Sequence, residues 1–168
     1  MWIYKFKKHN KIKNKLLSLI EDMPNEPIEH NYVKVDKSDW HLSKTFERPY
    51  LDFFYKNLND QMNEVCLDFN CTKWQIHNGW FQQYTKMNEH KWHTHQSTNL
   101  GAVYYLELPS KELATEFFDK SKPKIKEGDI IFFPAHKLHR SPENKTNKRK
   151  TVIAFNCDFY DWREKNEL

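Results

Sequence analysis

Long apolar runs are missing from this chain of 168 residues, whose mean hydropathy is -0.95. A helix that crosses a bilayer needs about 20 mostly apolar residues, and no window of this sequence supplies them. The first residues, Met1 to Phe6, also lack the apolar stretch of a secretory signal. The sequence therefore predicts a protein without membrane association, and we expect it in the cytoplasm.

Cysteine is scarce, with only Cys66, Cys71 and Cys157. An odd number without paired spacing predicts no disulfide framework and fits a reducing compartment. A zinc site at Cys66 and Cys71 is the weaker alternative, because the sequence has no second pair of cysteines to complete it.

A large excess of charge is absent as well, since 27 basic residues face 23 acidic ones and the formal net charge is +4. The densest basic cluster, residues 145–150, has no interleaved aromatic side chains and is typical of a solvated turn. We therefore expect no nucleic-acid partner.

The chain is rich in aromatic residues, which make up 15% of it. They give enough apolar surface for a packed core, and the length fits one domain. No internal repeat or low-complexity linker marks a boundary. We predict a single domain over 1–168, with a helical lead-in over 1–70 and a β-rich core over 71–160.

Two helices are predicted in the lead-in from apolar residues that recur every three or four positions. The first lies between Asn10 and Asp22, and packing on a core explains its pattern better than binding to a membrane surface. The second follows Pro49 and is the stronger of the two, with apolar side chains at Leu51, Phe54, Leu58, Met62 and Val65.

The second half changes to short β-type runs separated by turn residues. The predicted strands there are 73–77, 80–85, 102–108, 116–118, 123–126, 130–133, 138–141 and 151–159. An extended stretch is also predicted earlier in the chain, near 32–35. So many short strands favour a sandwich or barrel over alternating β-α units. The predicted fold class is mainly β with flanking helices, an α+β domain.

Histidines form the one pattern that suggests chemistry. His93 and His95 are two residues apart, so on an extended chain their side chains point the same way and could share a metal ion. His139 could add a third ligand from a distant strand. For the His93-Thr94-His95 pair taken alone, a solvated loop is the favoured explanation, because histidines in surface loops are common. His90 is expected beside the ligands rather than among them.

Arg149 lies ten residues beyond His139, at the start of an apolar β-run. An arginine that points into a β-core needs an anionic partner, because an unpaired buried guanidinium costs several kcal/mol. A bound dicarboxylate would supply that partner.

Together these residues resemble the iron(II)- and 2-oxoglutarate-dependent dioxygenase superfamily, in particular its small prolyl-hydroxylase-like branch. That family has His-x-Asp or His-x-Glu, a distal His, and an Arg or Lys nine to ten residues later. Tyr84, nine residues before His93, and the run 101–106, which ends in Tyr104-Tyr105-Leu106, extend the resemblance. It spans about residues 74–159, half of the chain.

The resemblance implies a double-stranded β-helix, the jelly roll that cupins also adopt, braced by the two N-terminal helices. It implies Fe(II) held by His93, His95 and His139 as the catalytic centre, with 2-oxoglutarate and O2 as cosubstrates. Arg149 would pair with the far carboxylate of 2-oxoglutarate, with Tyr105 or Tyr84 as a hydrogen-bond partner. The implied reaction is hydroxylation of an aliphatic C–H, with a prolyl or other amino-acid side chain, in a peptide or free, as the substrate.

One departure from the family keeps alternatives open. His95 stands where the family has an acid, so either three histidines bind the metal or a carboxylate such as Glu89 takes part. In a cupin-like metal-binding or sensory protein the same histidines would hold a metal, and Arg149 would bind another small anion or form a structural salt bridge. A three-histidine thiol dioxygenase that uses no 2-oxoglutarate is a further alternative. The sequence predicts a small-molecule or peptide substrate and leaves the oligomeric state open.

Overall fold

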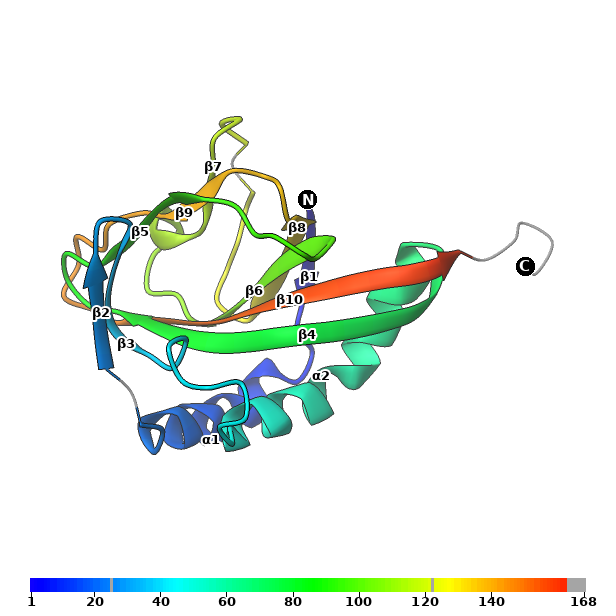
Figure 1. Cartoon of the computed structure of the whole chain (residues 1–168), viewed down its shortest axis with the longest axis horizontal. Helices are drawn as coiled ribbons and strands as arrows, with labels where there is room; N and C mark the ends of the chain where they lie inside the picture. The colour runs from blue at the N-terminus through cyan, green and yellow to red at the C-terminus, as the bar shows by residue number, and fades with distance from the viewer. Residues whose placement is uncertain (25, 122, 163–168) are drawn as a thin grey trace.

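The computed structural model describes residues 1–24, 26–121 and 123–162, which form a curled antiparallel sheet backed by two helices (Figure 1). The strand order is β1-β8-β6-β10-β4-β3-β5-β9-β7, with β2 paired to β3. The strands are β1 (Trp2–Lys5), β2 (Glu26–His30), β3 (Val33–Ser38), β4 (Cys71–Tyr84), β5 (Glu89–His93), β6 (Leu100–Glu107), β7 (Glu116–Phe117), β8 (Asp129–Pro134), β9 (His139–Ser141) and β10 (Lys150–Trp162). The predicted class, mainly β with flanking helices, is confirmed.

The helices are α1 (His9–Glu21) and α2 (Pro49–Asp68), with one 3₁₀ turn at Lys111–Leu113. Both form where the apolar spacing predicts them, and α2 begins at a proline, which suits the first turn of a helix. Leu16 on α1 and Phe54 and Leu58 on α2 are fully buried against the sheet. Within the described residues, neither helix is long and apolar enough to cross a membrane.

Alternation along the strands divides the apolar side chains between two cores. On β10, Ile153, Phe155 and Cys157 pack with the helices, whereas Val152 belongs to a second cluster with Tyr84 and others on the opposite face of the sheet. Figure 1 shows how this arises, because β5, β9 and β7 fold over the face of the sheet that the helices leave free. That inner face holds the site described below.

The strand predictions are corrected in detail. Runs 73–77 and 80–85 belong to one strand, β4, because the pairing with β10 continues on both sides of Gly79. No strand forms over 123–126, while β1, β2 and β5 were not predicted. Turn-forming residues such as Gly79 and Pro123 thus did not correctly predict where the strands begin and end.

Candidate metal site and adjoining cavities

Three histidines converge on the inner face of the sheet. His93 ends β5 and lies opposite His139, which begins β9, while His95 follows two residues after His93. Each offers one ring nitrogen, and these three nitrogens lie within 4.8 Å of one another. The pairing of two short strands therefore brings together side chains that are about 45 residues apart in the chain.

Hydrogen bonds fix the orientation of each ring. Nδ1 of His93 lies 2.8 Å from the backbone oxygen of Lys91, and Nδ1 of His139 lies 2.8 Å from that of Lys137. Nδ1 of His95 lies 2.5 Å from Oδ1 of Asn156. Because these oxygens only accept, each Nδ1 carries the proton and each Nε2 keeps a free lone pair, as metal-bound imidazoles require.

Burial keeps the rings neutral. Burial lowers the pKa of His139 to about 3, and the repulsion that a protonated His93 would exert acts in the same direction. The pKa values of His93 and His95 are also lowered, in both cases mainly by burial. Three neutral imidazoles that share one point suit a divalent ion of the iron, nickel, copper or zinc type, and they leave its other positions open. The donor set thus fits a transition metal.

His90 and Glu89 lie outside this group. The His90 ring stacks on His93 with 3.7 Å between ring centroids, and burial strongly lowers its pKa. Within the described residues, no carboxylate joins His93, His95 and His139. His90 therefore packs against the ring of His93 without joining the cluster, and Glu89 does not take the place of His95 as a ligand.

A buried lysine faces the same cavity as the histidines. Lys150 is 2% exposed, and its amine donates to the backbone oxygen of Leu113 at 2.6 Å and to the Ser141 hydroxyl at 2.8 Å. The amine also lies 4.8 Å from the centre of the Tyr84 ring. Burial lowers the pKa of Lys150 to about 7. In the described part of the chain, no carboxylate forms an ion pair with this amine.

Arg149 lies on the other face, which corrects the expectation that it points into the barrel. Its Nε donates to Glu107 at 2.9 Å, and one terminal nitrogen lies 2.5 Å from a carboxylate oxygen of Glu21 on α1. The physical reason is strand alternation, because neighbouring residues point to opposite faces and Lys150 takes the inward position. The partners of Arg149 are therefore carboxylates of the chain itself.

The two tyrosines expected near a cosubstrate are both buried on the inner face. Tyr84 lines the cavity between the histidines and Lys150, and its hydroxyl donates to Gln82 at 2.8 Å. The Tyr105 hydroxyl shares a hydrogen bond of 2.6 Å with the hydroxyl of Thr115, which also lines that cavity. Tyr84 thus borders the space directly, and Tyr105 supports Thr115.

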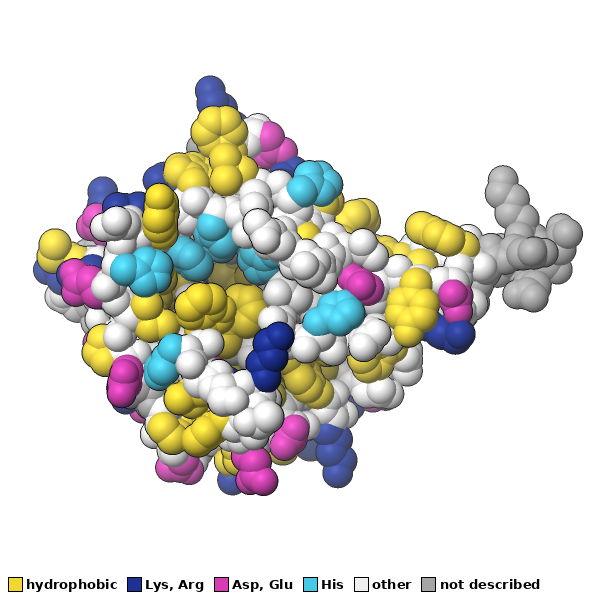
Figure 2. All heavy atoms as spheres, viewed as in Figure 1, with side chains coloured by type: hydrophobic (Ala, Val, Ile, Leu, Met, Phe, Trp, Pro, Cys, Tyr) yellow, Lys and Arg dark blue, Asp and Glu magenta, His cyan; other side chains and the backbone are white. Residues whose placement is uncertain are grey.

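Two spaces adjoin the histidines. A narrow inner cavity of about 40 Å³ is lined by His93, His95, His139 and Lys150. A wider outer cavity of about 290 Å³, lined by His93, His95, Trp40 and Trp80 among others, leads out to solvent. Figure 2 shows histidine side chains gathered around a hollow on this face, with hydrophobic side chains along its edge.

Lys150 and Asn156 are not among the site residues predicted from the sequence, although both lie at the site. Both have a signal in the sequence, because Lys150, Val152, Ala154 and Asn156 share one strand face by their even spacing. The family pattern also allows a lysine at the position assigned to Arg149. Which of two adjacent cations points inward depends on the register of β10, which the sequence did not establish.

No family model matches the sequence, and no curated protein matches it. Solved structures do match its fold. A viral collagen prolyl hydroxylase from Paramecium bursaria Chlorella virus-1, solved with 2-oxoglutarate, aligns with a TM-score of 0.59 and 16% identity, over 94% of this chain and 96% of that one. A 2OG-Fe(II) oxygenase family oxidoreductase from Burkholderia pseudomallei aligns with a TM-score of 0.66 and 12% identity, over 91% and 81%.

A third match is a prolyl hydroxylase from Trichoplax adhaerens, solved with a peptide fragment of the hypoxia-inducible factor. It has a TM-score of 0.63 and 11% identity, and the alignment covers 95% of this chain and 83% of that one. These likenesses confirm the predicted fold, the double-stranded β-helix of the 2OG-Fe(II) oxygenases.

Proposed function

We propose that this protein is an Fe(II)- and 2-oxoglutarate-dependent oxygenase that hydroxylates an aliphatic C–H bond. The observation that carries the proposal is the buried amine of Lys150, which faces the same inner cavity as three converging histidines. The likeness in fold to 2OG-Fe(II) oxygenases adds support.

The metal would be held by the Nε2 atoms of His93, His95 and His139. The Nδ1–H group of each ring is already engaged, because it donates to an oxygen acceptor. When bound, Fe(II) with 2-oxoglutarate lets O2 insert one oxygen atom into a C–H bond, with succinate and CO2 as the other products. The chain contributes a fixed set of three ligands on the inner face of the sheet.

Lys150 would bind the far carboxylate of 2-oxoglutarate. A buried amine without a carboxylate partner is destabilised when charged, as its lowered pKa indicates. An incoming carboxylate would stabilise the ammonium form by a charge-assisted hydrogen bond in a site of low dielectric. The Thr115 hydroxyl and Tyr84, which line the same cavity, would complete the pocket.

The substrate would enter through the outer cavity, past Trp40 and Trp80. An amino-acid side chain is the proposed target, with a prolyl residue as the first choice, since several proteins of similar fold are prolyl hydroxylases. The neutral His95 leaves the centre more positive by one charge than an acid would, which favours a dianionic cosubstrate.

A second candidate is a three-histidine thiol dioxygenase that uses no 2-oxoglutarate. The absence of a carboxylate from the histidine cluster, within the described residues, is the observation that favours it. Lys150 is an observation against a thiol substrate that lacks a carboxylate, because the buried amine would then have no anionic partner.

Anaerobic titration with Fe(II) and 2-oxoglutarate tests the proposal. We expect the weak visible charge-transfer band of their chelate in the wild type and its loss in His93→Ala. After air is admitted, succinate should form. A band that is absent from the wild type, or that survives in His93→Ala, would contradict the proposal, and activity without succinate would favour the thiol dioxygenase.

A further inference from the structure

The polar groups of the outer cavity come from uncharged side chains. This cavity, of about 290 Å³, adjoins the histidine cluster, and Trp40 and Trp80 form part of its wall. Among the described residues, its lining contains the carboxamides of Gln82, Gln96 and Asn156 and no Lys, Arg, Asp or Glu. An incoming molecule therefore meets hydrogen-bonding groups there, but no charged partner from the chain.

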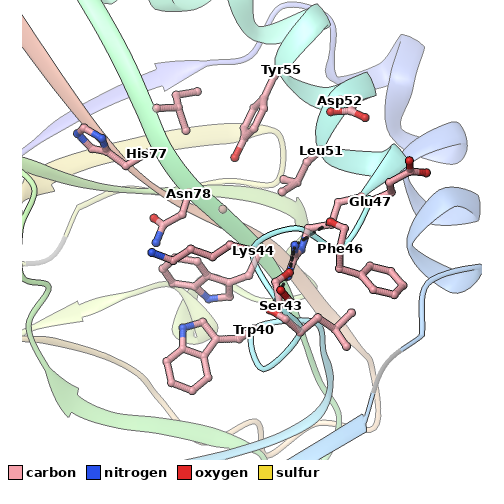
Figure 3. A pocket seen from close by; sticks show the side chains of 15 residues that line it. Trp40, Ser43, Lys44, Phe46, Glu47, Leu51, Asp52, Tyr55, His77 and Asn78 are labelled. Atoms are coloured by element: carbon pink, nitrogen blue, oxygen red, sulfur yellow. Dashed lines mark hydrogen bonds between the residues drawn. The ribbon is translucent and has the colours of Figure 1, made fainter.

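The charged side chains of this region line a neighbouring cavity instead. That second cavity, of about 790 Å³, shares Trp40 and Trp80 with the outer cavity. Figure 3 shows Trp40 in its wall together with Lys44, Glu47 and Asp52. The two indole rings thus line both a charged space and a neutral one, and the neutral one adjoins the metal site.

Gln82 offers N–H groups, rather than an acceptor, to the outer cavity. The Tyr84 hydroxyl donates to Oε1 of Gln82 at 2.8 Å, whereas Nε2 makes no hydrogen bond within the described part of the chain. The one fully buried polar side-chain atom without a partner, in those same residues, is the Tyr55 hydroxyl, so Nε2 of Gln82 keeps contact with accessible space. Gln82 lines both the inner and the outer cavity and therefore holds a free donor where the two meet.

Asn156 has the same asymmetry on the neighbouring strand. Its Oδ1 accepts the Nδ1 proton of His95 at 2.5 Å, and its Nδ2 has no acceptor among the residues that the structure describes. The register of β4 and β10 places Asn156 four residues beyond the partner of Gln82, about 13 Å along the strand, with Trp80 between the two. The two carboxamides therefore present donors on either side of Trp80.

This arrangement selects among ligand groups. A carboxamide normally offers an acceptor oxygen as well as two N–H groups, but here both oxygens are engaged by neighbours. An ammonium group, which only donates, would meet donors. A carboxylate would lose hydration without a charged partner from the chain. A neutral carbonyl oxygen accepts from both carboxamides at no such cost, and a few fixed polar groups of this kind decide which ligand a pocket takes.

We propose that Gln82 and Asn156 are specificity-determining residues, which donate their side-chain N–H groups to neutral carbonyl oxygens of the substrate. The group between those carbonyls lies at Trp80, whose ring centre is 6.0 Å from that of His95. The substrate is then a residue joined by amide bonds on both sides, and a free amino acid, with its ammonium and carboxylate groups, is rejected. The inference rests on the proposed function for the role of the histidines, and it narrows the substrate of that function.

The test compares each standard amino acid in two forms, the free form and the blocked form, which is its N-acetyl N-methylamide. Each compound is added to protein that carries Zn(II) and 2-oxoglutarate, and ¹⁵N–¹H spectra follow the side-chain amide signals of Gln82, assigned in the wild type. We expect at least one blocked form to bind and to shift these signals downfield, as a new hydrogen bond from Nε2 requires. The free form of the same amino acid should bind about tenfold more weakly or worse.

Gln82→Met removes the donor at nearly constant side-chain length. It should weaken binding of the blocked form about 3–10-fold, which corresponds to the loss of one hydrogen bond, and should change the affinity for 2-oxoglutarate by less than about twofold. Gln75→Met, the same substitution at an exposed position of β4, should alter neither affinity. The amide signals are read in the wild type, so the test holds even if Gln82→Met folds poorly.

Three results would overturn the inference. The first is that free amino acids bind as tightly as their blocked forms, or that no blocked form binds to protein that does bind 2-oxoglutarate. The second is that the Gln82 amide signals stay in place when a blocked form binds, or that Gln82→Met binds it as the wild type does. The third is that Gln82→Met weakens binding of 2-oxoglutarate instead.

Failure of the proposed function is a separate result. It appears as lack of 2-oxoglutarate binding, whereas blocked and free forms are also compared on Zn(II)-loaded protein without 2-oxoglutarate. The preference for the blocked form should persist there, because both carboxamides belong to the chain itself.

Discussion

Arg149 and Lys150 are adjacent in the chain, yet their side chains lie on opposite faces of the sheet. The Arg149 guanidinium pairs with Glu107 and Glu21 near α1, while the Lys150 amine donates to Leu113 and Ser141 inside the barrel. One cation therefore fastens a helix to the sheet, and the other is available to an anion at the inner cavity. The positions of these two cations on opposite faces, together with the geometry of the histidines, lead to four predictions.

Lys150→Met and Arg149→Met should have different effects. In Zn(II)-loaded protein, loss of the buried amine should weaken 2-oxoglutarate binding about 100-fold, because a desolvated charge pair is lost. Loss of the partly exposed Arg149 pairs should cost about 1 kcal/mol of folding stability and leave 2-oxoglutarate affinity within about twofold. Calorimetric titration measures the affinity for 2-oxoglutarate, and thermal melts measure the folding stability. Equal losses of affinity would show that Lys150 has no special role.

Binding of 2-oxoglutarate should take up a proton above pH 7. Because the pKa of Lys150 is lowered to about 7 by burial, the amine of the free protein is mostly neutral at pH 8, and the ligand carboxylate binds its protonated form. Affinity should therefore fall as pH rises, by up to about tenfold per unit.

Titration calorimetry at pH 8 in two buffers of different ionisation enthalpy measures this uptake, which should approach one proton. Lys150→Arg is the control, since a guanidinium stays charged and should bind without uptake. Zero uptake by the wild type would mean that the amine is already charged in the free protein or that it does not meet the ligand.

Metal binding should stabilise the fold through the three histidines. Zn(II) at 1,000 times its Kd adds about 4 kcal/mol, or roughly 8–16 °C in melting temperature for a chain of this size. His139→Ala should lose most of that shift relative to its own metal-free melt. His77→Ala, which removes a partner of Asp158 outside the cluster, should keep it. A full shift in His139→Ala would place the metal elsewhere.

Asn156 should set the orientation of His95. Its Oδ1 lies 2.5 Å from Nδ1, so Asn156→Leu removes the acceptor that keeps Nε2 free for a metal. Metal affinity, measured by competition with a chromophoric chelator, should fall about 10–100-fold. Asn156→Asp retains an acceptor oxygen and should therefore keep most of the metal affinity of the wild type. Unchanged affinity in Asn156→Leu would mean that packing alone holds the ring.

Much of the fold could be predicted from local patterns. The apolar spacing of residues such as Leu16, Phe54 and Leu58 identified both helices, since helical periodicity is a property of neighbouring residues. The continuity of β4 through Asn78 and Gly79 could not be predicted in this way, because it depends on β10, which lies opposite them in space and about 75 residues away in sequence.

The candidate site shows the same division. The sequence by itself determined which side chains were available, a His-x-His pair, a distal histidine and a cation about ten residues later, and their types suggested a metal and an anion. Only the tertiary structure decided that Lys150 rather than Arg149 shares a cavity with His139, that Asn156 supports His95, and that Tyr55 packs against Gly79 of β4. The reason is that a shift of one residue in strand register reverses every side chain, and register is decided by pairing between distant segments.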